Sequence, residues 1–288
     1  MSYISYSRDK FIATEEVNLG ILSNFLSVIR GFQVFTFLKT INSGNPIFLN
    51  YHVDRVLKNA ELMGLKVKIS KKELIFLVEK TLSKNDFSKS ECNIMIVFAG
   101  TSPTDDAGLR TDKFADLFIV ISKSKEYSKD SYQNGVSLGL FEYQRMDAKI
   151  KSPYTYYGGL KAQNIIDYKE FDEIIYHNDG KILEGTTFSF FGVKKDDTII
   201  TSKADGKILE SITRKVLIDV MKYNDIKYVI DDIPLEMINE FKEAFIASSN
   251  RDIIPVKSIN RKLLNGGIIG NNCKRIIKNY KAEIHSKN

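Results

Sequence analysis

The 288-residue sequence has little of the residues that build covalent and metal-bound frameworks. Its two cysteines, Cys92 and Cys273, lie far apart and belong to no CxxC motif, so neither a disulfide framework nor a cysteine-based zinc site is expected. Its three histidines, His52, His177 and His285, share no local ligand spacing. A histidine-rich metal site is therefore not expected either.

Long apolar runs are also missing. No stretch approaches the ~18 apolar residues of a membrane span, and residues 1–11 lack an apolar segment of signal-peptide length. Glycine and proline number 17 and 5, too few for a collagen-like or low-complexity chain. We therefore expect a cytoplasmic protein that binds no membrane.

Charge is present in both signs. The 42 basic and 36 acidic residues are interspersed, and the net charge of +6 forms no basic stripe, so no nucleic-acid partner is expected. The most basic stretch, residues 271–288, is interpreted as a terminal helix with Ile276 and Ile277 turned inward. Hydrophobic residues make up 43% of the chain, enough for a sizeable core.

Hydrophobic periodicity predicts the main elements of the first half. Short runs rich in β-forming residues predict strands at 34–40, 94–100 and 116–122. Apolar residues at helical spacing predict helices over 52–65 and 71–82.

The second half begins after a polar stretch. Residues 122–135 have no apolar periodicity and are typical of a linker. Beyond them, hairpins are predicted at 173–185, turning at Asn178-Asp179-Gly180, and at 187–201, turning at residues 194–197. A helix is predicted over 209–224, starting at Ser211. We expect a mixed α/β fold with an N-terminal domain over 1–123, an interdomain linker over 124–134 and a C-terminal domain over 135–288.

Familiar catalytic motifs are absent. The sequence has no GxxxxGK[ST] loop, no GxGxxG after a strand, no GxSxG elbow and no HExxH. With so few histidines, proton transfer is expected to fall to lysine, tyrosine or a carboxylate. One constellation remains: Lys151, then Glu184, then small hydroxyl residues at a helix start and at residues 248–249.

In this order, the pieces resemble the class IV (fold-type IV) pyridoxal-phosphate enzymes, which include branched-chain aminotransferases, D-amino-acid aminotransferases and aminodeoxychorismate lyase. The resemblance runs from about residue 28 to the C-terminus. It rests on these segments in sequence order: FLNYHVDRVLKNAELMGL, IKS, FDEIIYHNDGKILEG, ILESITRKVLI, and SSNRDIIPV ahead of GGIIGNNCKRI. It implies a two-domain, D-amino-acid aminotransferase-like α/β fold, a homodimer, and pyridoxal 5'-phosphate as the cofactor.

The resemblance also implies roles for individual residues. Lys151, in the C-terminal domain, is the Schiff-base lysine, with Lys149 as the competing candidate. Glu184 is the carboxylate at the pyridine nitrogen, which keeps the ring protonated as an electron sink. Arg55 matches the arginine of the phosphate site, where its planar fork suits a phosphate.

Three further residues complete the implied cofactor site. Ile212 and Thr213 open a helix, whose free N–H groups favour an anion. Ser249 stands where the family usually has a phosphate-binding threonine, and it keeps the hydroxyl.

The substrate side departs from the family pattern. Thr36 replaces an acid, Met95 and Ala99 stand where arginines are often found, and Ser189 replaces an asparagine. The specificity for an amino acid therefore stays open. The predicted function is a transaminase that moves an amino group between an amino acid and a 2-keto acid. The alternatives are aminodeoxychorismate lyase, which eliminates pyruvate, and a relative that keeps the fold without turnover.

Overall fold

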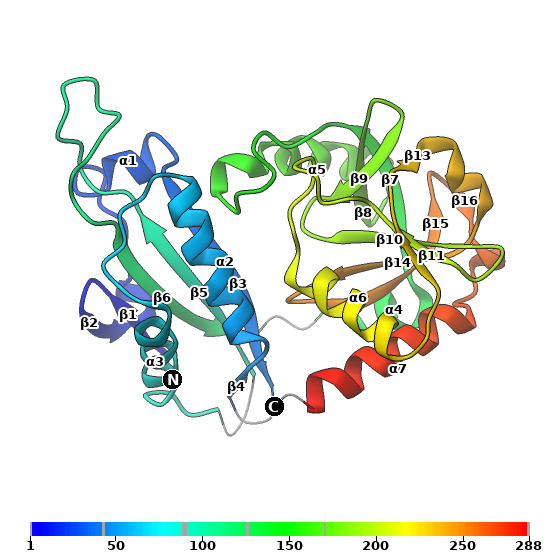
Figure 1. Ribbon diagram of the computed structural model, residues 1–288, viewed down its shortest axis with the longest axis horizontal. Helices are drawn as coiled ribbons and strands as arrows, with labels where there is room; N and C mark the ends of the chain where they lie inside the picture. The colour runs from blue at the N-terminus through cyan, green and yellow to red at the C-terminus, as the bar shows by residue number, and fades with distance from the viewer. Residues whose placement is uncertain (1, 42–43, 88–90, 125–126, 170, 287–288) are drawn as a thin grey trace. The chain divides into compact units, whose positions relative to one another are not determined.

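The computed structural model describes residues 2–41, 44–87, 91–124, 127–169 and 171–286. The chain divides into two compact units, here called unit 1 (Met1–Lys125 with Ile150–Tyr154) and unit 2 (Glu126–Lys149 with Thr155–Asn288). Each unit contains a β-sheet with helices packed against it (Figure 1).

Unit 1 contains an antiparallel six-stranded sheet in the order β2-β1-β6-β5-β3-β4. The strands are β1 (Ile4–Ser7), β2 (Lys10–Ala13), β3 (Gln33–Ile41), β4 (Asn45–Pro46), β5 (Cys92–Ala99) and β6 (Asp116–Lys123). The helices are α1 (Phe25–Val28), α2 (Leu49–Leu62) and α3 (Lys71–Leu82), with a 3₁₀ turn η1 (Thr14–Glu16).

The core of unit 1 lies between its sheet and the helices α2 and α3 (Figure 1). Strand β3 buries every second residue, so Val34, Thr36, Leu38 and Thr40 all turn into this core. Most inward residues of α2 are apolar and spaced three or four apart. The buried hydroxyl of Thr36 therefore faces a helix rather than water.

Unit 2 contains a mixed ten-stranded sheet in the order β12-β11-β10-β14-β15-β7-β8-β9-β13, with β16 paired to β15. The strands are β7 (Val136–Glu142), β8 (Glu173–Asn178), β9 (Lys181–Gly185), β10 (Ser189–Lys194), β11 (Ile199–Thr201), β12 (Tyr228–Ile230), β13 (Ile233–Pro234), β14 (Phe241–Ser248), β15 (Asp252–Ile259) and β16 (Lys262–Leu263). The helices are α4 (Lys129–Asn134), α5 (Tyr157–Lys169), α6 (Ile212–Tyr223) and α7 (Asn271–Ser286). Short 3₁₀ turns are η2 (Pro153–Tyr156), η3 (Leu235–Glu240) and η4 (Asn265–Gly267).

Helices cover this second sheet through apolar contacts. Helix α5 packs on β7 and β8, while α6 and α7 pack on β14 and on each other. The C-terminal helix is present as predicted, with Ile276 buried and Ile277 half-buried. Its basic residues are mostly exposed, which agrees with a solvated face.

Most predicted elements of unit 1 are confirmed. The strands predicted at 34–40, 94–100 and 116–122 are β3, β5 and β6, and the helix predicted over 71–82 is α3 with the same bounds. The helix predicted over 52–65 runs from Leu49 to Leu62 instead. It ends early because Gly64 takes a left-handed φ of 74° and the Leu65 N–H donates to the Ala60 carbonyl, which closes the last turn.

The predicted hairpins and helix of unit 2 are also confirmed. Asp179 and Gly180 both have positive φ, as the tight turn between β8 and β9 requires. Strands β10 and β11 form the second hairpin, and α6 begins after Ser211, whose side chain accepts the Arg214 N–H.

The segment predicted as a linker contains a helix that the sequence analysis missed. Helix α4 has no buried residue, so its sequence has no apolar periodicity that would predict a helix. Local hydrogen bonds form it instead: Ser128 Oγ accepts the Asp130 N–H, and Asn134 Nδ2 donates to Asp130. Residues 125 and 126 of this segment lie outside the described residues.

The described residues show neither a membrane-spanning helix nor a metal-binding cluster. No helix among them is long and apolar enough to cross a membrane. Within the same ranges, no three His, Cys, Asp or Glu side chains gather in a way that could hold a metal ion.

Candidate functional site

The predicted site residues form two groups, one in each unit. Unit 1 carries Arg55 and Lys151, and unit 2 carries Glu184, Ile212, Thr213 and Ser249. The sequence analysis placed Lys151 in the C-terminal domain, whereas in the structure its segment, Ile150–Tyr154, packs with unit 1. The predicted domain bounds themselves stay a prediction.

Arg55 extends from α2 toward β3. Its Nη2 donates to Thr36 Oγ1 at 2.8 Å, and the same Oγ1 lies 2.7 Å from His52 Nδ1. Burial, together with the positive charges of Arg55 and Lys151, lowers the pKa of His52 well below its ordinary value of 6.5. His52 is therefore neutral, and its Nδ1 accepts the Thr36 hydroxyl while the guanidinium keeps its charge for an anion.

The main chain of Lys151 is held on both sides. Its N–H donates to Asn59 Oδ1 at 2.8 Å, and its carbonyl accepts the Phe35 N–H at 3.0 Å. The ammonium lies 4.9 Å from the centre of the Phe35 ring. The competing candidate, Lys149, belongs to unit 2, where it is exposed and lies against Gly206. The half-buried position of Lys151 favours it over Lys149 as a reactive amine, which stays a prediction.

Glu184 is a buried carboxylate at the end of β9, only 4% exposed. Its Oε1 lies 3.1 Å from Arg145 Nε and accepts the Leu209 N–H at 3.2 Å. Leu209 precedes α6 by three residues. One hydrogen bond therefore ties this carboxylate to the segment that leads into the helix N-terminus.

Arg145 is buried beside the candidate residue Glu184, and the sequence analysis missed it. Its guanidinium lies 4.8 Å from the centre of the Tyr156 ring, and its Nη2 donates to the carbonyls of Gly185 and Thr186. Burial alone lowers the pKa of Arg145, but Glu184 and the neighbouring tyrosines raise it, and the net pKa lies above its ordinary value. The sequence carries no signal for this pairing, because a lone arginine in a loop is usually solvated.

The three residues of unit 2 that are predicted for phosphate binding lie at the start of α6 and at the turn after β14. Ile212 and Thr213 are the first two residues of α6, and both are buried. Thr213 Oγ1 lies 3.4 Å from Ser249 Oγ, so the structure brings these two hydroxyls together. A helix N-terminus flanked by two hydroxyl groups suits an anion.

A second ion pair lies beside this turn. Arg251, two residues after Ser249, pairs with Glu173 on β8, and its Nη2 lies 3.2 Å from Thr187 Oγ1. Its guanidinium also lies 5.1 Å from the centre of the Tyr127 ring. Glu173 and Arg251 are each about one-sixth exposed, so this pair resembles Glu184 and Arg145 in kind while being less buried.

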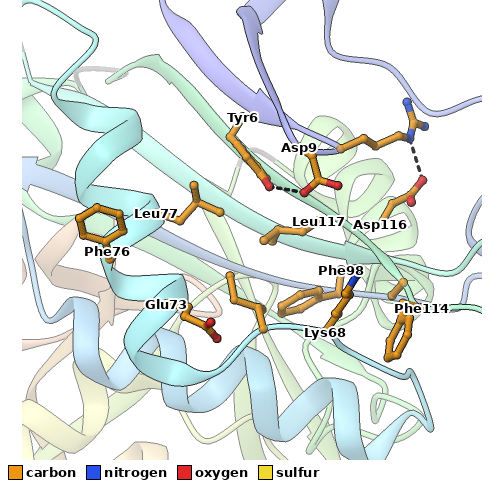
Figure 2. Close-up of a pocket in the computed structure, with 13 residues that line it drawn as sticks. Tyr6, Asp9, Lys68, Glu73, Phe76, Leu77, Phe98, Phe114, Asp116 and Leu117 are labelled. Atoms are coloured by element: carbon orange, nitrogen blue, oxygen red, sulfur yellow. Dashed lines mark hydrogen bonds and ion pairs between the residues drawn. The ribbon is translucent and has the colours of Figure 1, made fainter.

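A separate cavity of about 570 Å³ opens in unit 1 beside α3, β1 and β6 (Figure 2). Its charged groups are mostly paired, since Tyr6 donates to Asp9 at 2.7 Å and Arg8 pairs with Asp116 at the same distance (Figure 2). Phe76 and Phe114 line it and are more than half exposed. The described residues that line it include none of the predicted site residues.

The chain is similar to proteins of known family. The family model "Amino-transferase class IV" matches residues 33–259, more than half of the chain. A D-alanine aminotransferase of Listeria monocytogenes serotype 1/2a (strain 10403S) is 27% identical over 237 residues, which cover 80% of each chain.

Solved structures share the fold. The branched-chain aminotransferase from the archaeon Thermoproteus uzoniensis, solved with norvaline, matches with a TM-score of 0.89 at 24% identity, over 100% of this chain and 96% of that chain. An aminotransferase from Brucella abortus bound to PLP matches with a TM-score of 0.88 at 17% identity, over 99% and 100%. These likenesses confirm the predicted two-domain fold-type IV architecture.

Proposed function

Because the chain belongs to the class IV aminotransferase family, we propose that it uses pyridoxal 5'-phosphate to move an amino group between an amino acid and a 2-keto acid. Family membership confirms the predicted enzyme class, a transaminase. It does not favour the aminodeoxychorismate lyase alternative, because the curated relatives are D-alanine and branched-chain aminotransferases.

The observation that carries the proposal is the buried carboxylate of Glu184, bonded to the segment that leads into α6. Pyridoxal phosphate has a pyridine nitrogen and a phosphate on one rigid ring, so its site needs a carboxylate and an anion-binding helix start held together. Unit 2 has both, in Glu184 and in the N-terminus of α6 with its two hydroxyls. This donor set fits the cofactor.

The phosphate end would be held by charge and by hydrogen bonds. The N–H groups of Ile212 and Thr213 and the hydroxyl of Ser249 would donate to the phosphate oxygens. By the family pattern, Arg55 would supply a cation for the phosphate; Thr36 orients its guanidinium.

At the reacting end of the cofactor, transamination needs a base for the α-proton and a carboxylate at the pyridine nitrogen. When bound, pyridoxal phosphate supplies an electron sink for the electron pair left when the α-proton of the amino acid departs. Glu184 would accept the pyridine N–H and keep it protonated, while Arg145 compensates the buried charge of Glu184. Lys151 would hold the aldehyde carbon through its amine, with loss of water, and would act as a general base for the α-proton once the amino group of the substrate has replaced that amine.

The proposal is tested on the purified chain loaded with pyridoxal phosphate. Borohydride reduction followed by peptide mapping is expected to place the cofactor on Lys151, and Lys151→Ala is expected to abolish the adduct. Lys149→Ala is the matched control and is expected to keep it. An adduct on Lys149, or no adduct on the wild-type chain, would contradict the assignment.

A product assay separates the remaining alternatives. A transaminase converts an added 2-keto acid into its amino acid in the presence of an amino donor. A lyase instead yields pyruvate and aminobenzoate from aminodeoxychorismate. A chain that forms the adduct but makes neither product would be the relative without turnover.

We also propose that the protein is a homodimer. Unit 1 exposes apolar side chains in and around α1, with Ile21 63%, Leu22 81% and Ile29 50% exposed. Contiguous exposed apolar groups mark interaction sites, and twofold dimers are the commonest assembly.

A reducing location, the cytoplasm, is proposed from the two cysteines. Cys92 and Cys273 are both buried free thiols. Burial raises the pKa of Cys92 to about 11, which keeps this thiol protonated and inert.

A further inference from the structure

Helix α2 carries a polar stripe on its buried face. His52, Arg55 and Asn59 are spaced three and four residues apart, so their side chains lie on one side of the helix. His52 and Asn59 are only 1% and 3% exposed. Burying an amide costs free energy unless it is hydrogen-bonded, and an apolar residue would serve a plain core position better. The partners of these side chains therefore indicate what the stripe is for.

Asn59 is bonded to the predicted reactive lysine. Its Oδ1 accepts the N–H of Lys151 at 2.8 Å, and β3 holds the other side of the same residue through the Phe35 N–H. Lys151 belongs to neither a helix nor a strand, so no ladder of backbone hydrogen bonds fixes it. Its Cα is instead held between α2 and β3.

The other members of the stripe orient Arg55. Thr36, the neighbour of Phe35 on β3, accepts Arg55 Nη2 at 2.8 Å and donates to the neutral His52. Consequently α2 and β3 together hold both the main chain of Lys151 and the guanidinium of Arg55. Both residues are thus anchored to one helix and one strand, which are more rigid supports than loops.

We propose that Asn59 is a positioning residue, which places the amine of Lys151 at a fixed distance from Arg55 so that both ends of one ligand are bound at once. This inference rests on the proposed function, in which Lys151 binds the aldehyde and Arg55 the phosphate of the cofactor. Asn59 itself touches neither end and acts through the main chain of Lys151.

Two forms of the cofactor separate this role from a structural one. Pyridoxal phosphate has the aldehyde that reacts with a lysine, whereas pyridoxamine phosphate has none and is bound without that bond. Asn59→Leu removes the acceptor and is expected to weaken pyridoxal phosphate about tenfold, the effect of one hydrogen bond, while pyridoxamine phosphate changes less than twofold. The measurement is the dissociation constant of each form for the apo chain.

Two comparisons sharpen the test. Asn85→Leu is the matched control, because Asn85 Oδ1 accepts the Ile4 N–H at 2.7 Å in the same unit, and it should change neither constant. Thr36→Val acts through Arg55 and should weaken both forms equally. Asn59→Asp keeps an acceptor oxygen, and the ratio of its two constants should stay at the wild-type value.

Other outcomes overturn the inference. If the ratio of the two dissociation constants for Asn59→Leu stays at the wild-type value, because both forms are weakened equally or not at all, Asn59 has a structural role only. Asn59→Ala removes the same acceptor without adding volume. The two dissociation constants are therefore measured on this variant if Asn59→Leu does not fold. Failure of the wild-type chain to bind either form would instead contradict the proposed function.

Discussion

At the scale of single residues, the buried ion pair of Glu184 and Arg145 favours a role for Glu184 at the cofactor over that of an exposed turn residue. Glu184→Gln keeps the size of the side chain and an acceptor for the Leu209 N–H but removes the charge. We expect the variant to bind the cofactor and to lose roughly 10- to 150-fold in single-turnover amino transfer, since the missing charge matters most when the α-proton leaves.

Glu173→Gln is the matched control for this prediction. Glu173 is also paired with an arginine in unit 2 and is partly buried. Stability is measured for both variants, because removing one partner of a buried pair destabilises the fold. A Glu184→Gln variant with the wild-type rate per folded molecule would remove Glu184 from the site.

Arg55 gives a second prediction at this scale. Losing a charge-assisted phosphate contact costs about 1.5–3 kcal/mol, so Arg55→Ala should weaken cofactor binding roughly 10- to 150-fold. Arg110→Ala, which removes an exposed arginine of the same unit, should leave the affinity close to wild type. Equal effects of the two substitutions in a fluorescence titration would contradict the phosphate role.

His52 predicts a dependence of stability on pH. Burial lowers its pKa well below 6.5 in the folded chain, whereas the unfolded chain takes up the proton near pH 6.5. The stabilisation from the neutral histidine is therefore fully present above pH 6.5. As the pH falls from there toward the folded pKa, the unfolded chain binds a proton that the folded chain does not, and this stabilisation is lost. Below pH 6.5 and above the folded pKa, the free energy of unfolding of wild type should fall faster than that of His52→Gln, by up to about 1.4 kcal/mol per pH unit. Parallel urea-denaturation results for the two chains over this range would refute the prediction.

At the scale of elements, Ser211 caps the N-terminus of α6 and so stabilises unit 2. Its Oγ accepts the Arg214 N–H at 3.3 Å, which satisfies one free donor of the first turn. Ser211→Ala should lower the free energy of unfolding by ~1 kcal/mol, and Ser211→Gly by only a few tenths. Ser128→Ala serves as the comparison, because it uncaps α4, a helix without buried residues. A Ser211→Ala variant that keeps the wild-type free energy of unfolding in urea denaturation would show that α6 needs no cap.

At the scale of the whole molecule, the exposed apolar residues around α1 predict self-association. Leu22→Asp places a charge in this surface and should shift a dimeric mass toward the monomer in light scattering at micromolar concentration. Leu160→Asp is the control, since Leu160 is 71% exposed but lies on α5 of unit 2. A monomeric wild-type chain with bound cofactor would contradict the dimer.

The sequence by itself determined the local elements and the order of the site residues. Helix α3 and strands β3, β5 and β6 follow from apolar periodicity, because the side-chain period of an element decides which residues can share a buried face. The candidate cofactor residues were assigned from segments that resemble a family. The order of these segments can be seen in the sequence alone. Helix α4 was missed because local capping, and not burial, forms it.

Only the tertiary structure decided which polar groups meet. Lys151 and Asn59 are 92 positions apart, and Arg145 and Gly185 are 40 apart, yet each pair is hydrogen-bonded. Neither asparagine nor arginine signals in sequence that it is buried, since both are usually exposed. Their burial depends on the pairing of strands and the packing of α2 on β3, which bring distant acceptors and donors together and exclude water from them. The polar contacts that support the candidate site are therefore a property of the fold, whereas the reactive residues proposed for it follow from the order of segments along the chain and stay a prediction.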